Sequence, residues 1–322
     1  MQSDLEKKLK EAEQYRPPLT KRPDFDLFWE QTLNAAKKHN VDSRFIRLDY
    51  PSPFAEVYEV RYFGYDETLI YGIYIRPLFS EKTKLPCLIQ YHGFTQAAAK
   101  PSQLMHWAML GISVLAVDCR IQGGRTGNCA GFRSGGLVEN VTTLGLLDRD
   151  EYYYKAVYID AVKAIEAVRQ RPEVDEKKII VRGTSQGGAL AIAVSALSQI
   201  PALCIANVPS NSNLEARVIG RHGSFAAVNQ FLQRYPEEAE RAFETLSYFD
   251  TMNMADRIQS PVFASVALSD EVCPAKCFYA TYNRICAEKE ITVYPFNGHD
   301  GAAEVHLEKE IKWLRTKCMT AV

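Results

Sequence analysis

Two patterns of hydrophobic and polar positions divide the chain. Between Glu56 and Pro77 apolar and polar residues alternate on both sides of a short connection at 64–67. This alternation predicts an antiparallel hairpin, because successive side chains of a strand point to opposite faces. From Leu85 onward, short unbroken apolar runs alternate with helical stretches. Such runs are typical of parallel strands buried on both faces, so the sequence predicts an α/β fold with a mostly parallel central sheet covered by helices on both faces.

Six apolar runs are candidate parallel strands: 87–91, 112–117, 178–183, 203–208, 262–268 and 291–296. The segment 152–172 carries an apolar stripe at helical spacing and stops at a proline, which predicts a crossover helix. Residues from about 210 to 258 interrupt the alternation with a polar, helix-rich stretch. We predict one domain over residues 1–322, with a helical arm at 1–45 and a helical cap inserted at about 210–258.

Composition and charge exclude several classes of function. Lys and Arg number 38 against 39 Asp and Glu, and the net charge of −1 creates no field that would attract nucleic acid or anionic lipid. No run of 18 apolar residues occurs, and the charged first 16 residues lack the apolar core of a signal peptide. We therefore expect a soluble, cytoplasmic protein that binds neither nucleic acid nor a membrane.

The cysteines give no sign of a cofactor. All eight are scattered, several within apolar runs, so reduced and buried thiols are the simplest interpretation. Cys273 and Cys277 could face one way on a helix, but a zinc site needs two further ligands and none is nearby in the sequence. The sequence predicts no metal and no cofactor.

The clearest chemical motif is Gly-Thr-Ser-Gln-Gly at 183–187. Chance alone can produce this pattern, but here a strand-like run precedes it and a helix-like run follows, so Ser185 falls on the strand-to-helix turn called a nucleophile elbow in α/β-hydrolases. A Cβ at Gly183 or Gly187 would collide with the neighbouring strand or helix in so tight a turn. The alternative interpretation is an ordinary Gly-Ser loop in which the serine caps a helix.

A serine nucleophile needs a base and an orienting acid, which follow it in the order Ser, Asp, His in this fold. Asp270 comes directly after the strand-like run 262–268, and His299 lies in the loop before the final helical stretch. Glu271 and Asp118 remain alternatives for the acid, because one adjoins Asp270 and the other also ends a strand. Among the other histidines, His39 and His306 are interpreted as surface positions on helices, and His92 precedes the serine.

The segment Tyr91-His92-Gly93-Phe94 follows the first predicted parallel strand. That position supplies one amide of the oxyanion hole in α/β-hydrolases, and the residue after the nucleophile supplies the other. We therefore assign the oxyanion hole to the backbone amides of Phe94 and Gln186. A tight glycine turn without this role is the alternative.

Longer segments resemble the acetyl xylan esterase and cephalosporin C deacetylase family, carbohydrate esterase family seven. The resemblance covers nearly the whole chain, and its segments are 16–33, 91–94, 150–168, 172–179, 183–188, 242–255, 273–283 and the terminal histidine loop. It places the family triad on Ser185, Asp270 and His299. It implies removal of acetyl groups from short xylo-oligosaccharides and cephalosporin-type acetates by a cytoplasmic homo-oligomer, commonly a hexamer. Phe94 and Pro209 are expected to contact the substrate.

Three departures from the family pattern bear on specificity. The family's Arg-Gly-Gln motif is Arg120-Ile121-Gln122 here, and an isoleucine would be strained if the centre of the motif needed a positive φ. The usual His-Glu pair is His299-Asp300. The loop 207–213 lacks the usual aromatic residues, which predicts a more open substrate pocket.

The sequence therefore favours a serine esterase that acts on small acetylated sugars through an acyl-enzyme. A general short-chain carboxylesterase is the first alternative, and a peptidase resembling the prolyl oligopeptidases is another. Such peptidases carry a large propeller before the hydrolase domain, whereas about 84 residues precede the first parallel strand here. A hydrolase-like protein that binds without catalysis is the alternative from a different class.

Overall fold

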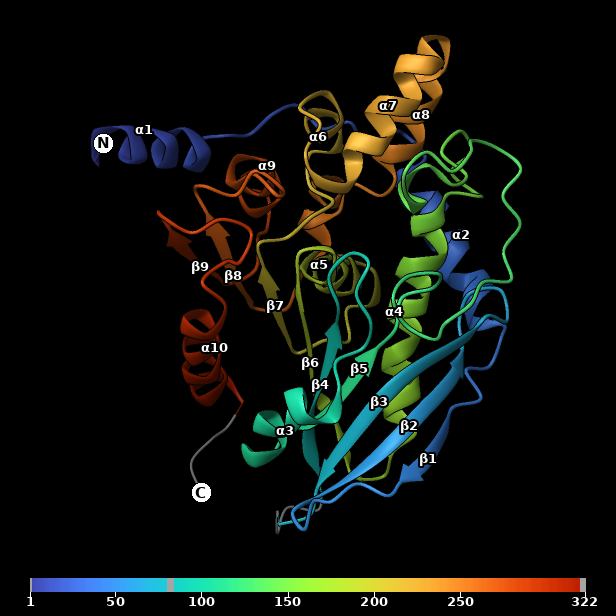
Figure 1. The fold of residues 1–322 in the computed structure, drawn as a ribbon, viewed down its shortest axis with the longest axis vertical. Coiled ribbons are helices and arrows are strands. Elements are labelled where there is room, and N and C mark those ends of the chain that lie inside the picture. Colours follow the sequence, from blue (N-terminus) through green and yellow to red (C-terminus); the bar gives the residue numbers. More distant parts are fainter. Residues whose placement is uncertain (1, 80–83, 319–322) are drawn as a thin grey trace.

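A computed structural model describes residues 2–79 and 84–318, and within them a nine-stranded mixed sheet forms the centre of the molecule (Figure 1). The strand order is β1-β2-β3-β5-β4-β6-β7-β8-β9. Strands β4 to β9 run parallel, while β1, β2 and β3 pair antiparallel at one edge. The strands are β1 Arg44–Leu48, β2 Ala55–Phe63, β3 Leu69–Pro77, β4 Leu85–Tyr91, β5 Ser113–Val117, β6 Val174–Thr184, β7 Leu203–Asn207, β8 Val262–Ala267 and β9 Lys289–Tyr294.

Helices cover both faces of this sheet, as the unbroken apolar runs predicted. In β6, Ile179 and Val181 point into the larger hydrophobic core, and Ile180 between them points into a second core on the other face. Helices α4 (Tyr153–Arg169) and α5 (Gln186–Ser198) pack in the first core, and α3 (Pro101–Met109) and α10 (Ala303–Lys317) in the second. The remaining helices are α1 Gln2–Glu13, α2 Phe25–Lys37, α6 Leu214–Ile219, α7 Ala226–Arg234, α8 Ala239–Ser247 and α9 Ala275–Tyr282.

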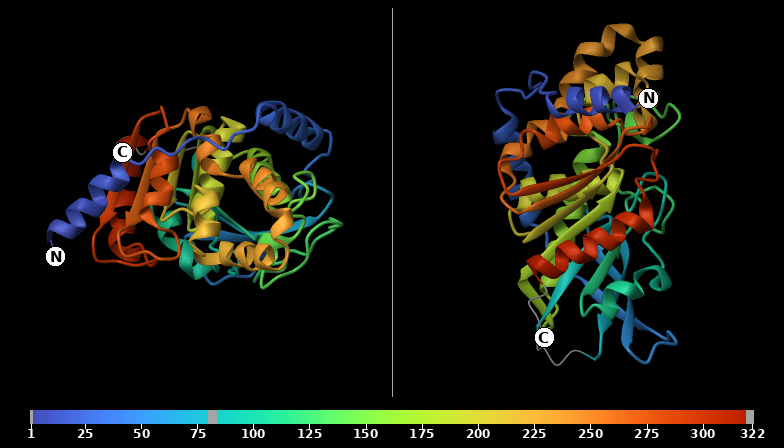
Figure 2. Two further views of the ribbon diagram at one scale, coloured as in Figure 1. Left: turned by 90° about the horizontal axis from the view of Figure 1, so that it is seen from above. Right: turned by 90° about the vertical axis from the view of Figure 1, so that its left-hand side faces the viewer.

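Helices α6, α7 and α8 stand between β7 and β8 in sequence and lie beyond the carboxyl ends of the parallel strands (Figures 1 and 2). Helix α1 projects from the body of the molecule in both figures, whereas α2 lies against the body. Trp29 of α2 is fully buried, and its indole N–H donates to the Tyr248 carbonyl at 3.0 Å. The division into one domain, an arm and a cap stays a prediction, although arm and cap segments are in direct contact.

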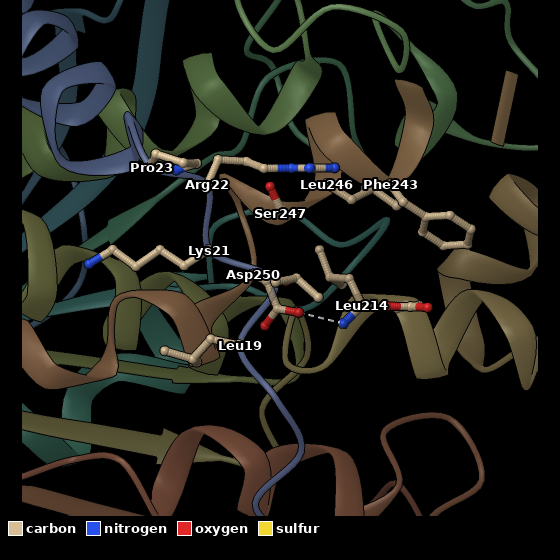
Figure 3. A pocket seen from close by; sticks show the side chains of 11 residues that line it. Leu19, Lys21, Arg22, Pro23, Leu214, Phe243, Leu246, Ser247 and Asp250 are labelled. Carbon is tan, nitrogen blue, oxygen red and sulfur yellow. Dashed lines mark hydrogen bonds between the residues drawn. The ribbon is translucent and has the colours of Figure 1, made fainter. Parts of the chain in front are cut away.

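A cavity of about 370 Å³ lies where the N-terminal segment meets these helices (Figure 3). Residues 19–23 form one wall, and Leu214, Phe243, Leu246 and Asp250 contribute to the other. The Asp250 carboxylate accepts the Leu214 amide at 2.6 Å, together with the amides of Asn213 and Met252. The Asp250 carboxylate has a structural role, because it already accepts hydrogen bonds from three backbone amides.

The final helix corrects one sequence interpretation. His306 is not a surface residue, since it is 1% exposed, stacks on Phe263 and bonds the Tyr294 hydroxyl through Nδ1 at 3.1 Å. Burial lowers its pKa to about 4, so the ring is neutral at pH 7. It is buried because α10 turns the face carrying His306, Glu310 and Trp313 toward the sheet. None of the helices in the described part of the chain is long and apolar enough to span a membrane.

Candidate active site

The turn between β6 and α5 has the geometry of a nucleophile elbow. Ser185 adopts φ 60° and ψ −118°, a conformation that costs a non-glycine residue about 1–3 kcal/mol. A Cβ on Gly183 would lie 2.2 Å from the Gly187 backbone, and one on Gly187 would lie 2.1 Å from the Tyr91 carbonyl oxygen. The collisions expected from the sequence are therefore present, with the helix in one case and the end of β4 in the other.

The three residues predicted to form a triad meet at the carboxyl ends of three different strands. His299 Nε2 lies 2.9 Å from Ser185 Oγ, and His299 Nδ1 lies 2.8 Å from Asp270 Oδ2. The other oxygen of Asp270 accepts the amides of Val272 and Cys273, each at 2.8 Å. This arrangement can carry a proton from the serine to the imidazole while the carboxylate fixes its tautomer.

The two alternative acids lie elsewhere. The Glu271 side chain is exposed. Asp118 is buried and holds loop backbone, since its oxygens accept the amides of Ala98 at 2.5 Å and Arg125 at 2.8 Å. His92 is likewise committed, because its Nε2 accepts the Cys119 amide and its Nδ1 bonds the Gly93 carbonyl. Burial lowers its pKa, in keeping with a neutral ring.

The electrostatics of the site favour a proton on His299. The hydrogen bond that His299 Nδ1 donates to the Asp270 carboxylate raises the pKa of the imidazole above its usual 6.5, and contact with Cys273 adds to the rise. Burial alone would raise the pKa of the Cys273 thiol, but Arg217 and His299 together lower it. Cys273 Sγ lies 3.9 Å from Ser185 Oγ. A histidine with a raised pKa accepts the serine proton more readily, provided that it starts unprotonated.

The two predicted oxyanion donors are the backbone amides of Phe94 and Gln186. Within the described residues neither amide donates a hydrogen bond. Gln122 ties the two segments together: its Oε1 accepts the Thr95 amide at 2.8 Å, and its Nε2 donates to Gln186 Oε1 at 2.9 Å. The oxyanion role of the two amides stays a prediction.

The departure at Ile121 has a structural cost. Its φ is 45°, which is unfavourable for a β-branched residue, so the strain expected from the sequence is present. The flanking residues hold it in place. Arg120 is fully buried and forms two hydrogen bonds to Asp160, and Gln122 makes the contacts described above.

A cavity of about 280 Å³ opens on the nucleophile, with walls formed by Gly93, Phe94, Gln96, Thr184, Ser185, Ser210, Arg217, Ser224, Val272, Cys273 and His299. Phe94 lies on its wall, as expected for a substrate contact. Pro209 does not; it is buried, and the next residue, Ser210, lines the cavity instead, because Val208 at φ 37° turns the chain and the Ser210 amide bonds the Ser185 carbonyl.

Sequence reasoning missed Arg217 and gave Cys273 no place in this site. Arg217 lies in α6, and no local motif marks it. Cys273 was considered only as half of a metal pair with Cys277. Within the described residues no cluster of three or more His, Cys, Asp or Glu could hold a metal ion. All eight cysteines are free, and Cys129 and Cys286 are exposed.

Comparisons with known proteins find related ester hydrolases. The acetyl xylan esterase family model matches residues 2–317. The chain is 29% identical to the acetyl esterase Axe7A of Xylanibacter ruminicola over 309 residues, which cover 92% of this chain and 68% of that protein. The structure of the acetyl xylan esterase from Paenibacillus sp. R4 superposes with a TM-score of 0.92 at 36% identity, covering 96% of this chain and 99% of that one. Acetyl xylan esterase 1 from Thermoanaerobacterium sp. JW/SL YS485 gives 0.90 at 26% identity, covering 96% and 98%.

Fold and matches together define an ester hydrolase with the α/β-hydrolase architecture. Within that class, the chain belongs to the acetyl xylan esterase family.

The glycine contacts at the elbow give a test of the local geometry. We expect Gly187→Ala to lower the free energy of unfolding by about 2–3 kcal/mol and to lower esterase activity sharply, because the new Cβ overlaps the Tyr91 carbonyl oxygen. Gly127→Ala is the matched control, since a Cβ there meets nothing within 4 Å. Urea unfolding and hydrolysis of 4-nitrophenyl acetate measure both effects. Equal behaviour of the two variants would contradict the elbow geometry.

The raised pKa of His299 predicts the pH dependence of hydrolysis. Protonated His299 cannot act as a base, so kcat/KM should rise with pH and reach half its plateau above pH 6.5. Asp270→Asn removes the largest cause of the rise, so the midpoint should move to lower pH and the plateau should fall about 10⁴-fold. Glu271→Gln serves as control and should change neither. A shift in the Glu271 variant instead of the Asp270 variant would assign the acid to Glu271.

Proposed function

We propose that this protein is a serine esterase that removes acetyl groups from sugar hydroxyls, with acetylated xylo-oligosaccharides as its substrates. The observation that carries the proposal is the hydrogen-bonded series Asp270–His299–Ser185, of which His299 and Ser185 lie on the wall of the cavity. Names of the similar proteins point to acetyl esters and xylan, and family membership extends that expectation to this chain. Cephalosporin C-type acetates have the same acetyl ester and are a second expected substrate.

The reaction follows from the positions of the side chains. Ser185 Oγ attacks the acetyl carbonyl carbon while its proton moves to His299 Nε2. The carbonyl oxygen becomes an oxyanion, which the Phe94 and Gln186 amides stabilise. Collapse of the intermediate breaks the bond to the sugar oxygen, and His299 returns the proton to that leaving oxygen. Water then attacks the carbonyl carbon of the acetyl-enzyme while His299 takes its proton. The bond to Ser185 Oγ breaks, His299 returns the proton to Ser185, and acetate leaves.

A small acyl group suits the walls around Ser185. The cavity of about 280 Å³ is slightly smaller than the usual range for ligand pockets, about 300–1,000 Å³, and the polar residues Ser210, Arg217 and Ser224 contribute to its lining. A long acyl chain would bring apolar surface against these polar groups without satisfying them. The same polar walls suit a hydroxylated leaving group.

Two kinds of substrate series test this proposal. With 4-nitrophenyl esters from acetyl to octanoyl, we expect kcat/KM to be highest for the shortest chains, and a preference for octanoyl would favour a general carboxylesterase instead. Acetate release from acetylated xylo-oligosaccharides and from cephalosporin C is measured alongside. Absence of release from both, with nitrophenyl acetate still hydrolysed, would contradict the carbohydrate part of the proposal.

The serine mechanism has its own test. Ser185→Ala should lower kcat by at least about 10³-fold, and a fluorophosphonate should label the wild type but not this variant. Labelling should also be lost in His299→Gln, because an unassisted serine is a poor nucleophile. Ser52→Ala, at a serine between β1 and β2 that does not line the cavity, is the control and should keep full activity and labelling. Retained activity in Ser185→Ala would overturn the mechanism.

A further inference from the structure

Arg217 is a buried cation on the wall of the catalytic cavity. It lies in α6 and is 1% exposed, yet it is one of the residues that line the cavity beside Ser185. Its Nη1 donates to Ser210 Oγ at 2.7 Å and contacts Cys273 Sγ at 3.5 Å. Its Nη2 reaches the Val272 carbonyl at 2.9 Å and the His222 carbonyl at 3.4 Å, while its Nε has no partner. The guanidinium thus has neutral oxygens, a sulfur and the Phe225 ring around it, with Cζ 5.1 Å from the ring centroid, and one unused donor at Nε.

Among the described residues Arg217 forms no ion pair with a carboxylate. By contrast, the fully buried Arg120 pairs with Asp160 and Asp66, and the largely buried Arg182 pairs with Glu310. Asp250 lies close enough for Arg217 to influence its pKa, but its oxygens accept three backbone amides, and burial raises its pKa to about 6. The Asp270 carboxylate already accepts a hydrogen bond from His299. Buried charges are normally paired, so an arginine without a carboxylate on a cavity wall indicates that the partner comes from outside the chain.

The position of the guanidinium relative to the reacting atoms limits what that partner can be. Cys273 Sγ bridges the two, lying 3.9 Å from Ser185 Oγ and 3.5 Å from Arg217 Nη1. A group bound by Arg217 therefore belongs to the same molecule as the ester and lies a few bonds from it. Only the Nε–H is without a partner, and a carboxylate is the fitting acceptor because a hydrogen bond between two charged groups is stronger than one to a neutral oxygen.

We propose that Arg217 is a specificity residue that binds a carboxylate on the ester substrate, so that this esterase prefers anionic esters. The inference rests on the proposed function, because it concerns the substrate of the Ser185 site. Two sources of the carboxylate share this chemistry. It is part of the alcohol, as in an acetylated sugar acid, or part of the acyl group, as in a hemisuccinate.

Matched ester pairs separate the two sources. For the alcohol, the pair is 4-acetoxybenzoate and its methyl ester; for the acyl group, it is mono-4-nitrophenyl succinate and its methyl ester. Release of the phenol gives kcat/KM for the acid and for the methyl ester in wild type and in Arg217→Met. Dividing the acid-to-ester ratio of the wild type by that of the variant cancels the intrinsic reactivity of each ester. If Arg217 only supports the structure, its replacement lowers kcat/KM for both members of a pair by the same factor and leaves this quotient at one.

We expect the quotient to be about ten or more in one pair, which then identifies the source of the carboxylate. Arg217→Lys should give a smaller quotient, because an ammonium keeps the charge but does not place a donor where Nε of the arginine stands. Arg234→Met is the matched control, since it removes an exposed cation from the neighbouring α7 and should leave the quotient near one. Quotients near one for Arg217→Met in both pairs, with Ser185-dependent hydrolysis of 4-nitrophenyl acetate intact, overturn the inference alone. Wild-type hydrolysis that does not depend on Ser185 overturns the proposed function and this inference together.

A measurement on the wild type keeps the inference testable if Arg217→Met does not fold. Competitive inhibition is compared between 4-hydroxybenzoate and its methyl ester, and between succinamate and succinamide. The carboxylate of one pair should inhibit at least about tenfold more strongly than its neutral partner. Equal inhibition within both pairs contradicts a carboxylate site at Arg217.

Discussion

The close approach of three backbone segments at the elbow is the constraint on which the rest of the site depends. The end of β4, the end of β6 and the start of α5 meet so tightly that neither Gly183 nor Gly187 has room for a Cβ. This packing forces Ser185 to a positive φ and fixes its side chain at the carboxyl edge of the sheet. The strain there is small beside the burial of α5, whose residues from Gln186 to Leu197 are buried throughout. A well-packed helix therefore holds an unfavourable turn in place.

Loops that converge on this turn are held by side chains bonded to backbone. Asp270 accepts two amides of its own loop before it reaches His299, His92 fixes the segment before Phe94, and Gln122 connects that segment to Gln186. Each such bond satisfies a polar group and restricts the direction of a loop. The positions of the base and of the candidate oxyanion amides thus follow from ordinary hydrogen-bond satisfaction, and Arg217 is conspicuous in this setting because its Nε is unsatisfied.

Reasoning from the sequence identified the features of the fold and of the site that short-range patterns determine. Alternation predicted the hairpin of β2 and β3, apolar runs predicted the parallel strands, and the chain order of Ser185, Asp270 and His299 predicted three residues that the fold brings into contact. Edge strand β1 was missed because its residues are exposed or half-buried and carry no alternation. His306 was misplaced because only tertiary packing turns its face of α10 toward the sheet. Arg217 had no local signal, since its role depends on loops that are distant in the sequence.

The residues of the proposed triad and the polar residues of the cavity wall stand on different parts of the fold, so the wall can change while the geometry of the triad stays. Ser185, Asp270 and His299 follow β6, β8 and β9, whose positions are set by the two hydrophobic cores. Ser210 and Arg217 belong to the segment after β7 that leads into the helices over the strand ends. Substitutions in that segment alter the charge and polarity of the cavity wall without disturbing the sheet. The ends of the strands therefore fix where the proposed triad stands, while the segment after β7 sets the polarity of the wall beside it.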